Sequence, residues 1–133
     1  MPPCEPALFC INPKTREVLK RFDFGEGDYP YSMDIDKSGE NLYILNGALG
    51  TLDLYKMSVD ANELPTVPFV NSQQTTDDSS KVFSTVAVSE DGDIYLTDVK
   101  NYMQNGDVLR YDSDGNFVTK FEAGIVPGAM MLN

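Results

Sequence analysis

Residues 35–46 read Ile-Asp-Lys-Ser-Gly-Glu-Asn-Leu-Tyr-Ile-Leu-Asn, and residues 88–98 read Val-Ser-Glu-Asp-Gly-Asp-Ile-Tyr-Leu-Thr-Asp. Each stretch begins at an apolar strand end, passes through a polar turn that contains Gly, and enters a short strand centred on Tyr. Each strand then closes on Asn or Asp. An internal repeat of about fifty residues indicates a tandem array of one supersecondary unit, so we let this repeat organise the interpretation of the whole chain.

Alternating apolar residues and turn residues predict further strands on both sides of these two stretches. No segment has the period of an amphipathic helix, so the predicted fold class is all-β. Pro65 and Pro68 lack a backbone N–H and place their strand at a sheet edge. Two long polar loops are predicted at 71–81 and 99–106. The strands are expected at 7–11, 17–24, 32–35, 42–46, 51–57, 64–70, 82–88, 94–98, 107–112 and 117–121.

Aligned against one another, these segments fall into four strand types, A to D, in the order C-D, A-B-C-D, A-B-C-D, A. A tandem unit of four antiparallel strands in the forty-to-fifty range is typical of a β-propeller blade. We therefore predict one partial β-propeller domain with about two full blades and parts of a third. Its pieces are strands C-D at 7–24, blades at 30–70 and 82–122, and the first strand of a next blade at 126–133.

Tyr-Ile-Leu-Asn at 43–46 and Tyr-Leu-Thr-Asp at 95–98 resemble the Tyr-Val-Thr-Asn motif of YVTN-type propellers. That family occurs in surface-layer and cell-envelope proteins. Residues 91–98 are also similar to blades of NHL and gluconolactonase-like propellers. The resemblance covers the chain from residue 7 onward and implies a repeat module of a cell-envelope or secreted bacterial protein.

Propeller rings use four to eight blades, and this chain supplies fewer than three. Two expectations follow: the chain is a fragment of a longer protein, or it is a protomer that completes a ring with copies of itself. We favour a fragment or short product that associates, for instance as two three-blade halves. The strand at 127–132 would then add to the hairpin at 8–22 of the same or a neighbouring chain, although strand B of that composite blade is missing.

Composition excludes several classes of function. Ten Lys and Arg against 21 Asp and Glu give a net charge of −11, which opposes binding to nucleic acid. The chain contains no His, so Ser-His-Asp and Cys-His catalytic sites are excluded and any metal would need oxygen ligands. Two cysteines, Cys4 and Cys10, are too few for a four-cysteine zinc site. The sequence is compatible with two free thiols or with one disulfide between them. No apolar run is long enough for a transmembrane segment, and residues 1–6 lack the features of a signal peptide.

The B–C and D–A loops of a propeller share one face, and here they include the two longest loops. Exposed aromatic rings beside amides and carboxylates suit a glycan or a protein ligand. The plainer interpretation is that Tyr29 and Tyr31 pack between blades and the polar loops are only solvated. The candidate ligand-binding residues are Tyr29, Tyr31, Asn46, Asp77, Asp78, Asp98, Lys100, Asn101 and Tyr102.

Residues 34–39 and 112–116 match the first half of a calcium loop, but no closing Glu follows, and turn chemistry explains their Asp, Ser, Asn and Gly. The resemblance to gluconolactonase-like enzymes implies a central divalent ion, for which Asn46 and Asp98 are weak candidates. We expect no cofactor, no catalytic residue and a non-catalytic binding or scaffold module. The alternatives are a metal-dependent, lactonase-like hydrolase active only as a complete ring, and a chain whose role is to complete a larger assembly.

Overall fold

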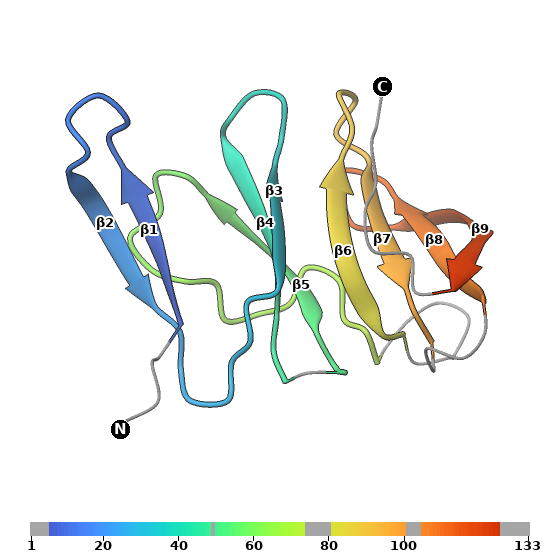
Figure 1. Ribbon diagram of the computed structural model, residues 1–133. Helices are drawn as coiled ribbons and strands as arrows, with labels where there is room; N and C mark the ends of the chain where they lie inside the picture. The colour runs from blue at the N-terminus through green and yellow to red at the C-terminus, as the bar shows by residue number, and fades with distance from the viewer. Residues whose placement is uncertain (1–5, 49, 74–80, 101–104, 126–133) are drawn as a thin grey trace.

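The computed structural model describes residues 6–48, 50–73, 81–100 and 105–125 (Figure 1). These residues form nine strands and no helix, and none of them belongs to a helix long and apolar enough to cross a membrane. The all-β prediction is confirmed. The strands are β1 (Ala7–Ile11), β2 (Val18–Asp23), β3 (Ser32–Ile35), β4 (Asn41–Asn46), β5 (Asp53–Ser58), β6 (Phe83–Val88), β7 (Ile94–Asp98), β8 (Asn105–Tyr111) and β9 (Phe117–Ile125).

The strands form three antiparallel sheets in chain order: β1–β2, β3–β4–β5 and β6–β7–β8–β9. Figure 1 shows the three sheets side by side, with the hairpin turns of β1–β2, β3–β4 and β6–β7 at the same end of the molecule. Within each sheet, every strand pairs antiparallel with the strand that follows it in the sequence. The molecule is therefore a row of meander sheets.

The repeat in sequence is also a repeat in strand register. Leu42 pairs with Met57 in the middle sheet, and the aligned Ile94 pairs with Tyr111 in the next sheet. The strand ends match in the same way, since Asn46 pairs with Asp53 and Asp98 pairs with Asp107. The two copies thus use the same side-chain positions for the same faces.

Strand β4 is buried on both faces. Ile44, 3% exposed, packs into an apolar cluster with Phe22 and Phe24 from the β1–β2 side. Leu45, fully buried, points the opposite way into the larger cluster that contains Phe83 and Leu96 of the β6–β9 sheet. Successive side chains of a strand alternate between faces, so β4 joins two separate cores. The β3–β5 sheet is consequently the middle layer.

The edge strands β3 and β6 of neighbouring sheets are joined by side-chain acceptors of β3. Val88 N donates to Asp34 Oδ2 at 2.8 Å, and Val86 N donates to Ser32 Oγ at 3.3 Å. The other Asp34 oxygen accepts a hydrogen bond from Ile35 N at 2.9 Å. Because β6 is an edge strand, these contacts satisfy N–H groups that face away from β7.

Each of the two calcium-like segments contains a hairpin turn held by an Asp at the start of that turn, Asp36 in the first and Asp112 in the second. Asp36 Oδ1 accepts hydrogen bonds from the backbone N–H groups of Glu40 and Asn41, and Gly39 supplies the positive φ of the turn. Asp112 accepts in the same way from the N–H groups two and four residues further on. These contacts support the structural interpretation of both segments.

Three sequence expectations differ from the structure. Residues 64–70 do not form a strand: only Val70 bridges to Leu54, because Pro65 and Pro68 cannot donate to a ladder. The predicted loop at 99–106 ends earlier, since β8 begins at Asn105, and β9 runs on to Ile125. In the segment 17–24, Phe22 and Phe24 are buried but Val18 is exposed. The strand predicted at 126–133 lies outside the described residues.

Acid should weaken the 36–41 turn in a way that depends on one carboxylate. Hydrogen bonding, above all from the Asn41 side chain, lowers the pKa of Asp36 to about 2. A pKa depressed by folding adds stability above the unfolded value and loses it as the pH falls toward the folded one. We expect the unfolding free energy of the wild type to fall more steeply between about pH 4 and pH 2 than that of Asp36→Asn, measured by urea unfolding.

The matched control is Asp60→Asn, an exposed acid whose carboxylate accepts no hydrogen bond from the described part of the chain. It should keep the wild-type pH dependence. Identical pH profiles for Asp36→Asn and the wild type would contradict this account.

Candidate functional site

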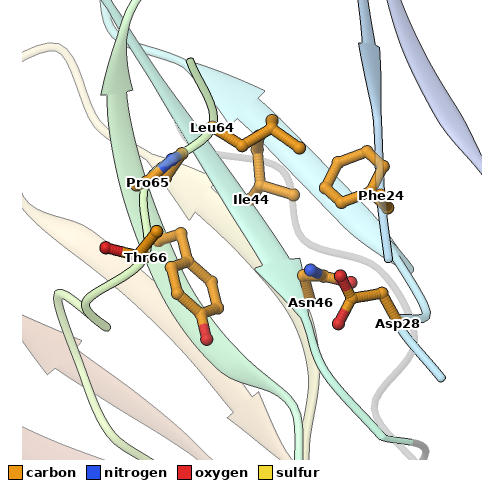
Figure 2. Close-up of a pocket in the computed structure, with 8 residues that line it drawn as sticks. Phe24, Asp28, Ile44, Asn46, Leu64, Pro65 and Thr66 are labelled. Atoms are coloured by element: carbon orange, nitrogen blue, oxygen red, sulfur yellow. The ribbon is translucent and has the colours of Figure 1, made fainter. Parts of the chain in front are cut away.

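A pocket of about 320 Å³ opens between the end of β2 and the middle sheet. Figure 2 shows its walls and the polar side chains at one end of it. The pocket is lined by an aromatic ring and a carboxylate from the segment after β2, two side chains from β4, one from β5 and three from the segment after β5. Its lining residues are Phe24, Asp28, Ile44, Asn46, Tyr55, Leu64, Pro65 and Thr66.

Strand geometry explains how these side chains meet. Ile44 and Asn46 are two apart on β4 and share a face, and Ile44 pairs across the ladder with Tyr55. Ile44 also packs in the apolar cluster beside Phe24, with Leu64 packed against it. The pocket therefore has apolar walls along β4 and polar groups at the end of that strand.

Asn46 is the least satisfied polar group of the pocket. It is 8% exposed, and its Oδ1 atom accepts no hydrogen bond from the described residues. The carboxylate-bearing Asp28 lines the same pocket, and Figure 2 draws both side chains at it. A buried acceptor without a partner costs about 1–3 kcal/mol, so this oxygen would be stabilised by a donor from a bound water or a ligand.

Asp28 brings a negative charge to the same place. One of its oxygens, Oδ2, accepts a hydrogen bond from Gly25 N at 3.0 Å. Burial raises the pKa of Tyr55, and the charges of Asp53 and Asp28 raise it further. The Tyr55 hydroxyl is thus protonated at neutral pH. No Lys or Arg is among the lining residues.

Tyr29 and Tyr31 form a stacked pair outside this pocket. Their ring centroids are 5.7 Å apart at an interplanar angle of 25°. They are 47% and 52% exposed, so they are not packed between the sheets as the plainer interpretation required. Tyr31 also lines a second cavity of about 190 Å³, which shares Phe24 and Ile44 with the first.

Asp98 has a structural role, although it occupies the position equivalent to Asn46. It is 3% exposed, and its Oδ1 accepts hydrogen bonds from Val82 N and Lys100 N, both at 3.0 Å. Lys100 in turn pairs with Asp107 at 3.3 Å. The pocket that Asn46 lines therefore also includes Asp28 and Tyr55, but it does not include Asp98.

The remaining predicted site residues, Asp77, Asp78, Asn101 and Tyr102, lie outside the described residues. Within the described ranges no group of three or more His, Cys, Asp and Glu side chains is arranged to hold a metal ion. Cys10 carries a free, exposed thiol.

Sequence reasoning nominated Asn46 but missed Asp28 and Tyr55. A signal for Tyr55 exists, because a strand that alternates Ile44 and Asn46 on one face must place a cross-strand neighbour beside them. Asp28 lies in a loop after β2 and reaches the pocket only through tertiary packing, which leaves no local pattern.

No protein-family model matches this chain, and no curated protein sequence matches it. The likeness to YVTN-type, NHL and gluconolactonase-like propellers therefore rests on the quoted motifs alone.

The contrast between Asn46 and Asp98 predicts opposite effects of the same replacement. Asn46→Leu removes a buried acceptor without a partner and should raise the free energy of unfolding by about 1 kcal/mol. Asp98→Leu leaves the N–H groups of Val82 and Lys100 unpaired and should lower it by about 2 kcal/mol or more. Urea unfolding of both variants measures this. If Asn46→Leu destabilises as strongly as Asp98→Leu, Asn46 is a structural residue.

Proposed function

We propose that this chain is a non-catalytic binding module built from β-propeller-type units, with a glycan or a protein as its ligand. The observation that carries the proposal is the pocket at the end of β4, which Asp28 also lines and where Asn46 Oδ1 is buried without a partner in the described structure. Apolar walls with a few converging polar groups are the usual composition of a ligand site.

Three features favour the propeller arrangement. The two aligned units share strand register, their sheets lie in a row with separate cores between them, and three hairpin turns lie at one end (Figure 1). Placement in the cell envelope or outside the cell is part of the same proposal and rests on the YVTN-like motif.

The lactonase-like alternative needs Asn46 and Asp98 to hold one metal ion. Both end the second strand of their units, which favours that pairing by analogy. Against it, the Asp98 Oδ1 already accepts two backbone hydrogen bonds. The pocket contains Asn46 without Asp98, so the two residues proposed to hold the ion do not meet there.

Association of several copies is part of the proposal. Apolar side chains of β1 and β3 remain exposed, among them Phe9 and Ile11 on β1 and Met33 and Ile35 on β3. Leu8, Met33 and Ile35 also line an apolar groove of about 260 Å³ between the two strands. In the described structure β1 pairs only with β2, and such an uncovered edge with apolar neighbours favours contact with a further sheet.

Light scattering tests the association. We expect a mass above the 14.7 kDa of one chain at micromolar concentration, and Ile35→Lys should shift it back toward 14.7 kDa by placing a charge in the groove. Val67→Lys is the matched control, since Val67 is 76% exposed and does not line that groove. A wild-type monomer would rule out ring completion by copies of the chain.

Array binding tests the module itself. The wild type should be retained on a subset of immobilised glycans or peptides, and Asn46→Leu should lose that retention while remaining folded. Lactone and ester hydrolysis is assayed on the same samples with calcium added. If the wild type hydrolyses a lactone or ester and both Asn46→Leu and Asp98→Asn lose this activity, the proposed binding function is wrong and the hydrolase is supported.

A further inference from the structure

We infer that the pocket lined by Asn46 and Asp28 selects an alkylammonium group, the chemistry of a lysine side chain in a protein partner. The inference rests on the proposed binding function and names the ligand class for that same site.

The Asn46 and Asp28 oxygens that are available to a ligand are acceptors, so a ligand that binds them must be a donor. Asn46 Oδ1 has no partner in the described structure, and Asp28 uses Oδ2 for Gly25 N, which leaves its second oxygen for a ligand. An ammonium group has three donors and no acceptor, so it complements such a pair of oxygens. A hydrogen bond from an ammonium to a carboxylate is also stronger than one between neutral groups.

The local charge favours a cation over a neutral or anionic ligand. The negative charges of Asp53 and Asp28 act on the Tyr55 hydroxyl strongly enough to contribute to its raised pKa. No Lys or Arg among the lining residues offsets them, and the whole chain has a net charge of −11. A neutral sugar can donate hydrogen bonds here but gains no attraction between charges, whereas a phosphate or carboxylate is repelled.

The walls fit the apolar part of the same ligand. Phe24, Ile44, Leu64 and Pro65 line the pocket next to the polar end (Figure 2). A lysine side chain carries its charge on a four-carbon stem, which can lie along such walls while the ammonium reaches the oxygens. The Phe24 and Tyr55 rings are also surfaces that attract cations.

A metal ion fits this pocket less well. Calcium requires about six to eight oxygen ligands, and the pocket offers the oxygens of Asn46 and Asp28 with the hydroxyls of Tyr55 and Thr66. The apolar walls would leave the rest of its coordination shell to water. An organic cation needs fewer acceptors and uses the walls.

The test is a titration of the ¹⁵N-labelled full chain with Nα-acetyl-lysine methylamide, followed by the backbone amide signals in NMR. The comparison probe is Nα,Nε-diacetyl-lysine methylamide, which has the same stem but no charge. We expect the charged probe to shift the amides of Asn46 and Tyr55 in a saturable way. The acetylated probe should bind about tenfold more weakly or not at all.

Variants distinguish binding at the pocket from a general attraction of the cation to the negatively charged chain. Asp28→Asn should weaken binding of the charged probe by about tenfold, and Asn46→Leu should also weaken it. Asp60→Asn removes the same charge from an exposed site outside the pocket and should leave the affinity unchanged. The amide spectrum of each variant reports whether it remains folded.

The outcomes are distinct from those of the proposed function. Equal binding of the acetylated probe, unchanged affinity in folded Asp28→Asn, or the absence of shifts at Asn46 and Tyr55 overturns the ammonium inference. If the arrays also reveal a glycan whose retention needs Asn46, the binding module stands and only its ligand class is wrong. If calcium chloride alone reproduces the shifts at matched ionic strength, the pocket is a metal site and the inference fails.

Discussion

The structure depends on one strand that is apolar on both faces. In β4, Ile44 and Leu45 are adjacent and point to opposite sides, and each is almost completely buried. Because side chains alternate with a period of two, the register of β4 fixes which residues enter which core, and a slip of one residue would exchange them. The same constraint positions Asn46 on the Ile44 face, where the pocket opens. Core packing and the candidate site thus follow from one register.

Much of this arrangement could be predicted from sequence. The repeated turn has a Gly at its tight position and a side-chain acceptor at its start, and it sets the ends of β3, β4, β6 and β7. Asp36 and Gly39 meet the local backbone requirements in the first copy, and Ser89 and Gly92 meet them in the second. Residues 64–70 were predicted as a strand from their apolar content. The segment forms only one bridge, between Val70 and Leu54, because Pro65 and Pro68 lack the N–H groups that a strand ladder needs.

The pocket could be predicted only in part. Asn46 was nominated because it ends a repeated strand, and its equivalent Asp98 was nominated on the same grounds. Their surroundings differ. The carboxylate of Asp98 accepts hydrogen bonds from the N–H groups of Val82 and Lys100, whereas Asn46 lines a pocket together with Asp28 from the loop after β2. Equivalent positions in a repeat share backbone geometry but not neighbours from loops. For this reason the repeated motif predicts the same role for Asn46 and Asp98, whereas their tertiary contacts indicate different roles.

The Asp34 carboxylate, which accepts hydrogen bonds from both Ile35 N and Val88 N, has a consequence for behaviour in concentrated solution. An incoming polypeptide that adds to a sheet must find unoccupied N–H groups along the edge strand, and at β6 the side chains of Ser32 and Asp34 occupy two of them. Strand β1 has no comparable acceptors along its outer edge within the described structure. Addition of a further strand is therefore hindered at β6 and is less hindered at the outer edge of β1.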